Sequence, residues 1–533
     1  MKKNIYTISK LLFIAFFSIA ISSSFVSCLE DNINEHAATD DDMDKDNLRV
    51  GGFFNTMLKD VIPTSDVDAN DYQRAQNLTG DIFSGYMAHI GTWNSSSHNG
   101  TYNLYFDKWN DVGFTNGYGK VMGPYFNINK TIEEMDSYAA ADIVKAMSTI
   151  VKIMGMHRLT DNYGPIPYTE FGKGGLTTPY DSQETIYKSF LDELKEATTN
   201  LAEYLDADPA TTKILDKFDM IYGGDIHKWL KLGNTLRLRL AMRICYVEPE
   251  LAKKHAEEAA NQKYGLLSDP TDIAQLKSYG GHIVYHPLET VWNSYADTRM
   301  GASMDSYLNG YNDPRLSYYF QTSSYGGYNG ARNGLVINDK APYVKLSAPN
   351  IQKNTPVLWM SPAEAYFLLA EGALRGWNMG GTAQDFYEEG IRASFAQHGA
   401  SGVDGYIQNS TDIPARFVDK VSYNNINAYS SITIAWKSSS NFETNLERII
   451  TQKWIAMFPE GQEAWTEFRR TGYPKLFPVV KNNSNGNIDT QIQIRRIVFP
   501  QEEYNKNREE VDKAVGLLGG PDTGGTKLWW DAK

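Results

Sequence analysis

The sequence predicts a mostly α-helical protein, in which a scaffold of helix pairs carries a loop-rich part with small β elements. Several stretches repeat apolar residues at three- and four-residue spacing, the period of an amphipathic helix. Between them lie long segments rich in Gly, Asn, Ser and Tyr that lack sustained helical spacing: 51–140, 265–358 and 399–441. Loops of this length are usually functional or disordered, and their aromatic content argues against disorder.

The chain begins with a secretory signal that leads to a cysteine. Three lysines accompany an apolar run of 11 residues, 11–21, which is too short for the roughly 20 residues that span a bilayer. Small residues and the sequence Phe-Val-Ser-Cys28 follow, and they resemble the bacterial lipobox, whose cysteine is acylated. We therefore predict a lipoprotein signal peptide over 1–27 and lipidation of Cys28. The alternative is an ordinary signal peptide with a chance cysteine.

The next segment is strongly acidic. Residues 29–46 contain eight acidic residues and one lysine, and such a block stays solvated and extended. We expect residues 28–50 to form the lipidated cysteine and a tether. Acidic residues at this place also resemble the surface-export signal of Bacteroidota lipoproteins, whereas the alternative is a plain spacer.

Charge and hydropathy limit the partners of the remaining chain. The 506 residues after the signal carry a net charge of −16, because the signal holds three lysines and no acid. This charge argues against nucleic acid and against charge-driven binding to anionic membranes. A second apolar run of 18 residues is absent from the sequence, so the lipid on Cys28 is the membrane attachment that we expect. Cys245 is then left as a free thiol, which we expect to be buried.

Seven helices follow from the periodicity and its boundary signals. Asp181-Ser182 and Ser361-Pro362 are typical helix starts, and a Gly-Gly turn separates the fourth and fifth helices. The expected helices cover residues 143–154, 183–205, 229–244, 363–376, 383–398, 446–457 and 462–469. Small residues at the crossing of the fourth and fifth helices resemble tetratricopeptide units.

Two aromatic-dense stretches, Tyr86–Phe126 and Tyr285–Tyr328, carry the candidate ligand site. A sugar ring has an apolar face that an indole or phenol ring can cover, and hydroxyls that amide, Arg and carboxylate groups can bond. We predict that glycan-binding residues come from both stretches, although packing beneath the loops is the alternative for each ring. The candidates are Trp93, Asn94, Tyr102, Trp109, Trp292, Asn293, Tyr325, Tyr328 and Arg332.

Signatures of catalysis and of cofactors are weak. His282 and His286 have helical spacing, but Gly281 and Pro287 flank them and the zinc motif H-E-x-x-H is absent. A carboxylate pair of the glycosidase type stays open because acidic residues are abundant, although none stands out. We expect no catalytic residue, no metal ligand and no cofactor, with a structural calcium ion left open.

The C-terminal quarter carries a specific resemblance. Residues 452–474 read QKWIAMFPEGQEAWTEFRRTGYP, residues 494–500 read IRRIVFP, and KLWWD follows at 527–531. With RLTDNYGPIPY at 158–168 and WMSPAEAYFLLAEG at 359–372, these motifs resemble the SusD/RagB family of outer-membrane nutrient-uptake lipoproteins. The resemblance covers nearly the whole chain after the signal.

The resemblance implies the architecture of the rest of the chain. It implies a single SusD-like domain over 51–533, with a loop-rich ligand-binding part at about 51–117 and 265–358. It further implies four tetratricopeptide-like helix pairs at about 118–160, 183–245, 361–398 and 443–470. The C-terminal motif would be structural, with Trp454 and Trp465 packed inside. Its arginines would pair with buried acids such as Glu463: Arg469, Arg470, Arg495 and Arg496.

The resemblance also implies the function. The chain would be a non-catalytic cell-surface lipoprotein, anchored in the outer membrane and facing the exterior. It would capture an oligosaccharide or polysaccharide and deliver it to a SusC-like TonB-dependent transporter. In the family's starch-binding member the sugar lies between an early loop and a mid-chain loop, roughly where the two aromatic-dense stretches lie. The alternatives are a surface glycoside hydrolase and a protein-binding helical-repeat scaffold.

Overall fold

A computed structural model describes residues 47–533 except 65–68, 94–96, 105–108 and 136. Two predicted functional residues, Cys28 and Asn94, lie outside the described residues, as does most of the acidic tether. The chain divides into two units, Met1–Arg49 and Val50–Lys533. The second unit is mostly helical with a few short strands, which confirms the predicted fold class.

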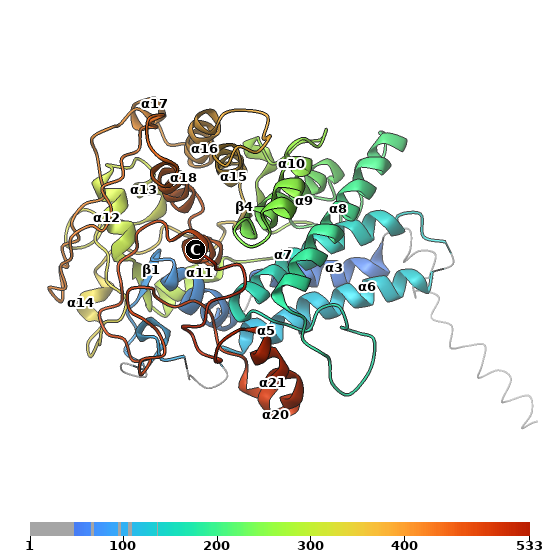
Figure 1. The fold of residues 1–533 in the computed structure, drawn as a ribbon, viewed down its shortest axis with the longest axis horizontal. Helices are drawn as coiled ribbons and strands as arrows, with labels where there is room; N and C mark the ends of the chain where they lie inside the picture. Colours follow the sequence, from blue (N-terminus) through green and yellow to red (C-terminus); the bar gives the residue numbers. More distant parts are fainter. Residues whose placement is uncertain (1–46, 65–68, 94–96, 105–108, 136) are drawn as a thin grey trace, which may run out of the picture. The chain divides into compact units, whose positions relative to one another are not determined.

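Successive helices in the first half of this unit lie side by side (Figure 1). Side-chain caps fix two of their starts, because Ser182 accepts the amide of Thr185 and Asp225 accepts the amide of Lys228. Cys245 follows the fourth of these helices and is buried with a free thiol. The helices are α6 (Gly123–Glu133), α7 (Ala141–Tyr163), α8 (Gln183–Ala207), α9 (Ile226–Arg243) and α10 (Pro249–Ala260).

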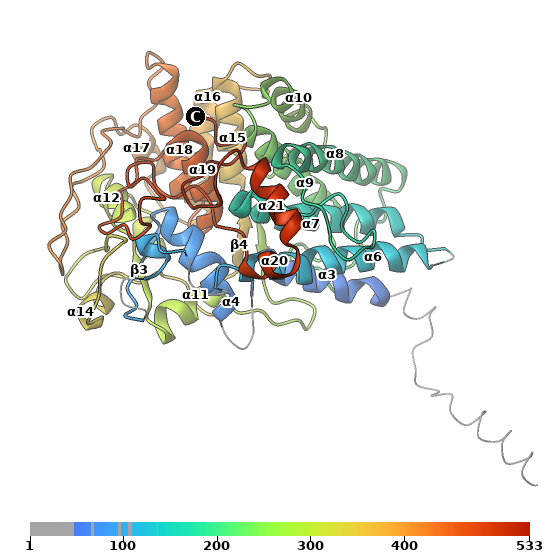
Figure 2. The same cartoon turned by 60° about the horizontal axis from the view of Figure 1, so that its bottom comes forward.

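The second half contributes a further group of helices, of which α15 lies beside α9 and α10 (Figure 2). Ser361 accepts the amide of Glu364 at 3.4 Å, so the predicted start at Ser361-Pro362 is confirmed. The helices are α15 (Pro362–Leu374), α16 (Ala383–His398), α17 (Val403–Ile407), α18 (Phe442–Ala456) and α19 (Gly461–Thr471), followed by α20 (Gln501–Lys506) and α21 (Arg508–Leu517).

A buried charge cluster joins helices α7, α9, α15, α18 and α19. Arg243 contacts Glu463 at 2.5 Å, and Arg239 contacts Glu364 at 2.6 Å. Because these side chains are at most 2% exposed, ion pairs and hydrogen bonds inside the protein compensate their desolvation. The cluster therefore fixes how the five helices cross. Its members are Asp161, Arg239, Arg243, Glu364, Glu371, Lys453, Glu463, Glu467 and Arg470.

The C-terminal motif is largely structural, as predicted. Trp454 and Trp465 are fully buried. Arg470 pairs with Glu371 and Glu467, Arg495 pairs with Asp531, and Arg496 pairs with Asp522. The prediction for Arg469 is wrong. This guanidinium donates to main-chain oxygens and to a threonine, and the described residues place no carboxylate within 4.0 Å of it.

The segment 51–140 is far more helical than its sequence suggested. It contains most of α3 (Leu48–Asp60), and all of α4 (Asn70–Tyr72), α5 (Val112–Asn116) and α6, with two π-helical stretches, η1 (Gln73–Asp81) and η3 (Gly117–Met122). A π-helix has wider turns than an α-helix, so mixed turns break the 3.6-residue period that sequence analysis detects. Packing also selects Gly80 in η1, since a Cβ there would lie 2.6 Å from the backbone of Gln462.

Short antiparallel strands tie distant segments together. In one pair, β1 (Met87–His89) lies against β3 (Thr298–Met300), with His89 opposite Thr298. In the other, β2 (Ala274–Leu276) lies against β4 (Val357–Met360). The β1–β3 pair brings the two predicted aromatic-dense stretches to one place. The remaining elements are η2 (Asn99–Thr101), η4 (Pro270–Asp272), α11 (Pro287–Glu289), η5 (Thr290–Ser294), α12 (Ala302–Gly310), α13 (Leu316–Tyr319) and α14 (Ala341–Val344).

Candidate functional site

Two half-buried indole rings form the centre of the candidate site. The ring centroids of Trp93 and Trp109 are 4.9 Å apart, and their planes are inclined by 47°. Arg74, at the start of η1, lines the same cleft. The cleft measures only about 10 Å³, so a ligand here would lie on the open ring faces and not inside it. We call these three residues the Trp93 ledge. Both indoles keep part of their surface open to solvent, as a platform for stacking requires.

The buried carboxylate of Asp297 holds the indole of Trp93 in place. Trp93 donates its Nε1–H to Oδ2 of Asp297 at 3.3 Å. The same oxygen accepts the amide of Gln73 at 3.1 Å, and Oδ1 accepts Nζ of Lys340 at 3.3 Å. Asp297 is only 8% exposed. It fixes the indole of Trp93 and is itself held by Gln73 and Lys340, so groups from three distant parts of the chain set the position of the ring.

Two buried histidines support the indole from the protein side. The ring centroid of His89 lies 4.6 Å from that of Trp93, and the same distance separates His89 from His98. Burial lowers the pKa of His89 well below its usual value and that of His98 to about 4, so both rings are neutral near pH 7. Gly91 permits this packing, because a Cβ there would lie 2.6 Å from both His89 and Trp93.

A polar hollow of about 310 Å³ adjoins the ledge, since Arg74 lines both. Asp71 accepts a hydrogen bond from Arg74 at 2.7 Å and lies 3.7 Å from Lys120. Asn70 accepts the hydroxyl of Tyr295 at 3.4 Å. A carboxylate, a guanidinium, an ammonium and an amide therefore surround one opening beside the indoles.

A further carboxyl in the polar hollow has a shifted pKa. Burial raises the pKa of Asp60 to about 6, and the ammonium of Lys120 at 3.3 Å only partly offsets this shift. The hollow therefore gains negative charge as the pH rises through about 6. Its volume falls within the usual range for small-molecule sites, and apolar rings beside a few polar groups suit a saccharide.

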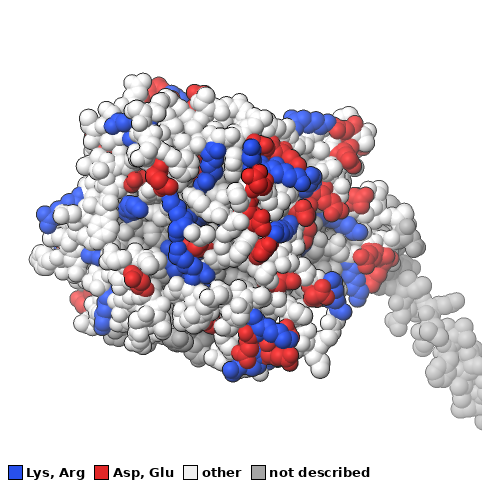
Figure 3. All heavy atoms as spheres, viewed as in Figure 1, with Lys and Arg blue, Asp and Glu red and all other residues white. Residues whose placement is uncertain are grey.

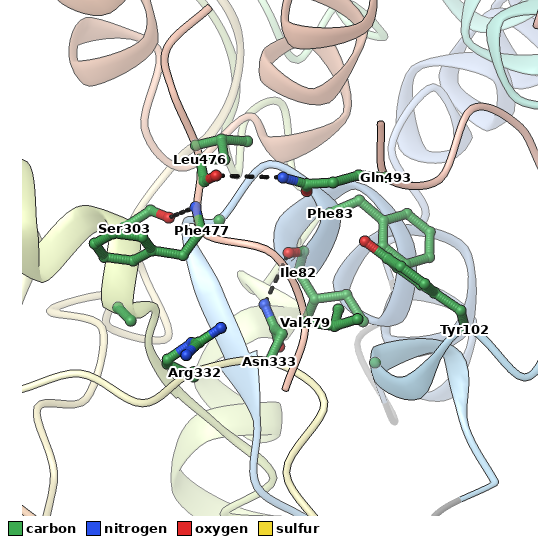
Figure 4. A pocket seen from close by; sticks show the side chains of 13 residues that line it. Ile82, Phe83, Tyr102, Ser303, Arg332, Asn333, Leu476, Phe477, Val479 and Gln493 are labelled. Carbon is green, nitrogen blue, oxygen red and sulfur yellow. Dashed lines mark hydrogen bonds between the residues drawn. The ribbon is translucent and has the colours of Figure 1, made fainter. Parts of the chain in front are cut away.

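Tyr102 and Arg332, two of the predicted glycan-binding residues, lie away from the Trp93 ledge. Tyr102 is 3% exposed, so its ring is sealed in the interior. Both residues line a cavity of about 20 Å³ that shares no lining residue with the ledge cleft (Figure 4). Arg332 there donates to the carbonyl of Pro478 at 2.7 Å. Later segments of the chain close this cavity, and the spacing of neighbouring residues in the sequence could not predict those contacts.

Four further candidates lie elsewhere. Trp292 is half-buried and donates to the carbonyl of Ile351 at 2.8 Å, while Asn293 is exposed and donates to Glu289. Tyr325 is 40% exposed and donates to a carbonyl at the start of α14, and Tyr328 packs against the core. None of the four lines the ledge cleft or the polar hollow.

Sequence reasoning missed several residues of the site, namely Arg74, Asp71, Tyr295, Asp297 and Lys340. Tyr295 lies inside the second aromatic-dense stretch and could have been selected there. Arg74 and Asp71 belong to the polar run Asn-Asp-Tyr-Gln-Arg, which gave a weaker signal. Asp297 and Lys340 carried none, because their role depends on the β1–β3 pairing.

The described residues show neither a metal-binding cluster nor a membrane-spanning helix. They contain no group of three or more His, Cys, Asp or Glu side chains arranged to hold a metal ion. No helix in this part of the chain has the length and apolar character needed to cross a membrane.

Comparison with known proteins gives one consistent result. The sequence model of the family "SusD-like: Susd and RagB outer membrane lipoprotein" matches residues 30–531. A solved chitin-binding SusD homologue from Flavobacterium johnsoniae is 43% identical, with a TM-score of 0.86, and the match covers 91% of this chain and 99% of that one.

Other solved structures agree. A SusD homologue from Bacteroides uniformis is 38% identical, with a TM-score of 0.84. One from Bacteroides thetaiotaomicron is 35% identical, with a TM-score of 0.83. Each match covers 91% of this chain and 99% of the homologue. No curated protein matched the sequence.

Proposed function

Because this chain belongs to the SusD-like family of outer-membrane lipoproteins, we propose that it captures a saccharide on the Trp93 ledge. Proteins of this family bind carbohydrate and are not enzymes. The observation that carries the proposal is the pair of partly exposed indoles, 4.9 Å apart, beside a polar hollow. The rings would cover the C–H faces of successive sugar units, and Arg74 and Asp71 would bond their hydroxyls.

The wider setting is part of the same proposal. A lipid on Cys28 would hold the protein on the outer membrane, with the ledge facing the exterior. The captured saccharide would then pass to a SusC-like TonB-dependent transporter. The apolar run and cysteine at the start of the sequence support the anchor, and the outer-membrane lipoprotein family supports the location.

Isothermal titration with a chitin hexasaccharide tests the ledge. This probe is chosen because a 43% identical homologue binds chitin. Truncating a central Trp of an interface commonly costs at least about 2 kcal/mol, or roughly thirtyfold in affinity. We expect Trp93→Ala to cause such a loss. The matched control is Trp377→Ala, which removes a half-buried indole that lines neither the ledge nor the hollow.

The outcomes separate the proposal from its rivals. Equal binding by both variants, with unchanged melting temperatures, would place the saccharide elsewhere on the protein. Release of reducing ends by the purified protein would instead favour a hydrolase. If a glycan array shows no binding while the lipidated chain still co-purifies with a transporter, the chain is a protein-binding scaffold. A Trp93→Ala variant that keeps the transporter but loses the sugar supports the complete proposal.

A further inference from the structure

A second hollow, of about 480 Å³, lies beside the end of α19 and the last residues of the chain. We call it the basic hollow. Its charged lining residues are all cationic: Arg469, Lys475, Arg495, Lys527 and Lys533. Figure 3 shows Lys and Arg side chains gathered near the middle of this face, where the C-terminus lies in Figure 1. On a protein with net charge −13, such a gathering of one sign needs an explanation.

Three of the five cations are already paired. Arg495 contacts both carboxylate oxygens of Asp531, at 2.5 and 2.6 Å. Lys533 contacts Glu443 at 2.6 Å. Lys527 donates to the main-chain oxygen of Lys533 at 2.8 Å and lies 3.9 Å from Asp531. Two side-chain carboxylates, those of Asp531 and Glu443, thus face five cationic side chains.

The other two cations have no such partner. Within the described part of the chain, no carboxylate lies within 4.0 Å of Lys475, whose Nζ sits 4.4 Å from the ring centroid of Tyr473. Arg469 is 1% exposed and stacks on Trp465 at 3.5 Å. Its Nη atoms reach only uncharged oxygens, and its buried Nε–H has no hydrogen-bond partner among the described residues.

A buried guanidinium without a carboxylate is costly unless an anion compensates it. Burial lowers the pKa of Arg469 to about 9, yet the group stays protonated at pH 7. Clefts lined by one sign of charge also focus the field and concentrate ligands of the opposite sign. The basic hollow is therefore electrostatically incomplete as it stands. It also has apolar walls, formed by Phe468, Leu476 and Ile492.

We propose that the basic hollow binds an acidic sugar unit, a pyranose ring that carries a carboxylate or a sulfate ester. Lys475 and Arg469 would face the oxyanion, since ammonium and guanidinium groups make strong charge-assisted hydrogen bonds to such oxygens. Phe468 and Ile492 would cover the C–H face of the ring. This site is separate from the Trp93 ledge, and the inference does not rest on the function proposed for that ledge.

Saturation-transfer NMR with glucuronic acid tests the inference at pH 7 and constant ionic strength. We expect a saturable signal for glucuronic acid and a much weaker one for neutral N-acetylglucosamine. Because Lys475 is exposed, Lys475→Ala should fold normally and weaken glucuronic acid binding about tenfold or more. The matched control Lys254→Ala removes an exposed lysine of α10 that does not line the basic hollow, and it should bind like the wild type.

Two further results are expected. Sodium sulfate should displace glucuronic acid from the wild type, and Trp93→Ala should leave the signal unchanged. Loss of the signal in Trp93→Ala would assign the acid to the ledge and overturn the inference. Equal glucuronic acid binding by Lys475→Ala and Lys254→Ala would also overturn the inference, as would the absence of a glucuronic acid signal from the wild type. Sulfate binding that depends on Lys475 without any glucuronic acid signal would overturn the saccharide part.

Discussion

Replacing Glu463 with Gln should destabilise the protein strongly, because Glu463 balances the positive charges at the centre of the buried charge cluster. Its carboxylate lies 2.5 Å from Arg243 and 3.9 Å from both Arg239 and Lys453. Although burial opposes ionisation, these cations hold the pKa of Glu463 below its usual value. The native state therefore contains a carboxylate that the neutral amide cannot replace.

The size of the effect follows from the burial. Removing one partner of a buried ion pair typically costs about 3–5 kcal/mol, because the remaining charge is left uncompensated. Unfolding entropy is about 2.1 cal/mol/K per residue, which gives roughly 1 kcal/mol/K for Val50–Lys533. We therefore expect the melting temperature at pH 7 to fall by about 3–5 °C.

Differential scanning calorimetry measures this change against Glu134→Gln. Glu134 lies 4.0 Å from Lys130, and both side chains are more than half exposed, so this control should melt within about 1 °C of the wild type. The gap between the two variants should narrow as the pH falls below about 4.5, the ordinary pKa of a glutamate, because the unfolded chain then binds a proton that the native Glu463 does not. A Glu463→Gln protein that melts with the control at pH 7 would refute the reasoning.

Two further changes test the site. Asp60→Asn should raise the free energy of unfolding at pH 7.5 by up to about 3 kcal/mol and change it little at pH 4. The raised pKa of Asp60 destabilises the native state only as the pH increases through about 4 to 6. Urea unfolding at both pH values measures this, and an equal effect at both would contradict it. Asp297→Ala should weaken chitin hexasaccharide binding although Trp93 itself is unchanged, because the indole loses the acceptor of its Nε1–H. Titration alongside an Asp489→Ala control checks this, and unchanged affinity would show that the indole needs no such support.

Local sequence signals identified much of the scaffold. The resemblance to the SusD/RagB family, seen in motifs such as FRRTGYP, is confirmed by the family match over residues 30–531. Helix starts such as Ser361-Pro362 were predictable because capping depends on residues three positions apart. The structural role of Trp454 and Trp465 was predictable from their motif, and both are fully buried.

Signals that depend on distant contacts were missed. The helices η1 and η3 mix α and π turns, so no single apolar stripe marks them. Arg469 was expected to meet an acid because it resembles its neighbours in sequence, but the nearest oxygens belong to main-chain carbonyls of α7 and of Arg495. The neighbouring Arg470 reaches Glu371 and Glu467 instead.

The sequence by itself determined the family, the mostly helical fold class and the two stretches that supply aromatic rings. Only the tertiary structure decided which of those rings are open to a ligand, since Tyr102 is sealed while Trp93 and Trp109 stay half-exposed. Helical periodicity and caps are properties of neighbouring residues, whereas exposure depends on what the rest of the chain packs against a side chain. Here the carboxylate of Asp297 holds Trp93 at the surface, whereas Tyr102 packs near Phe83 in the interior.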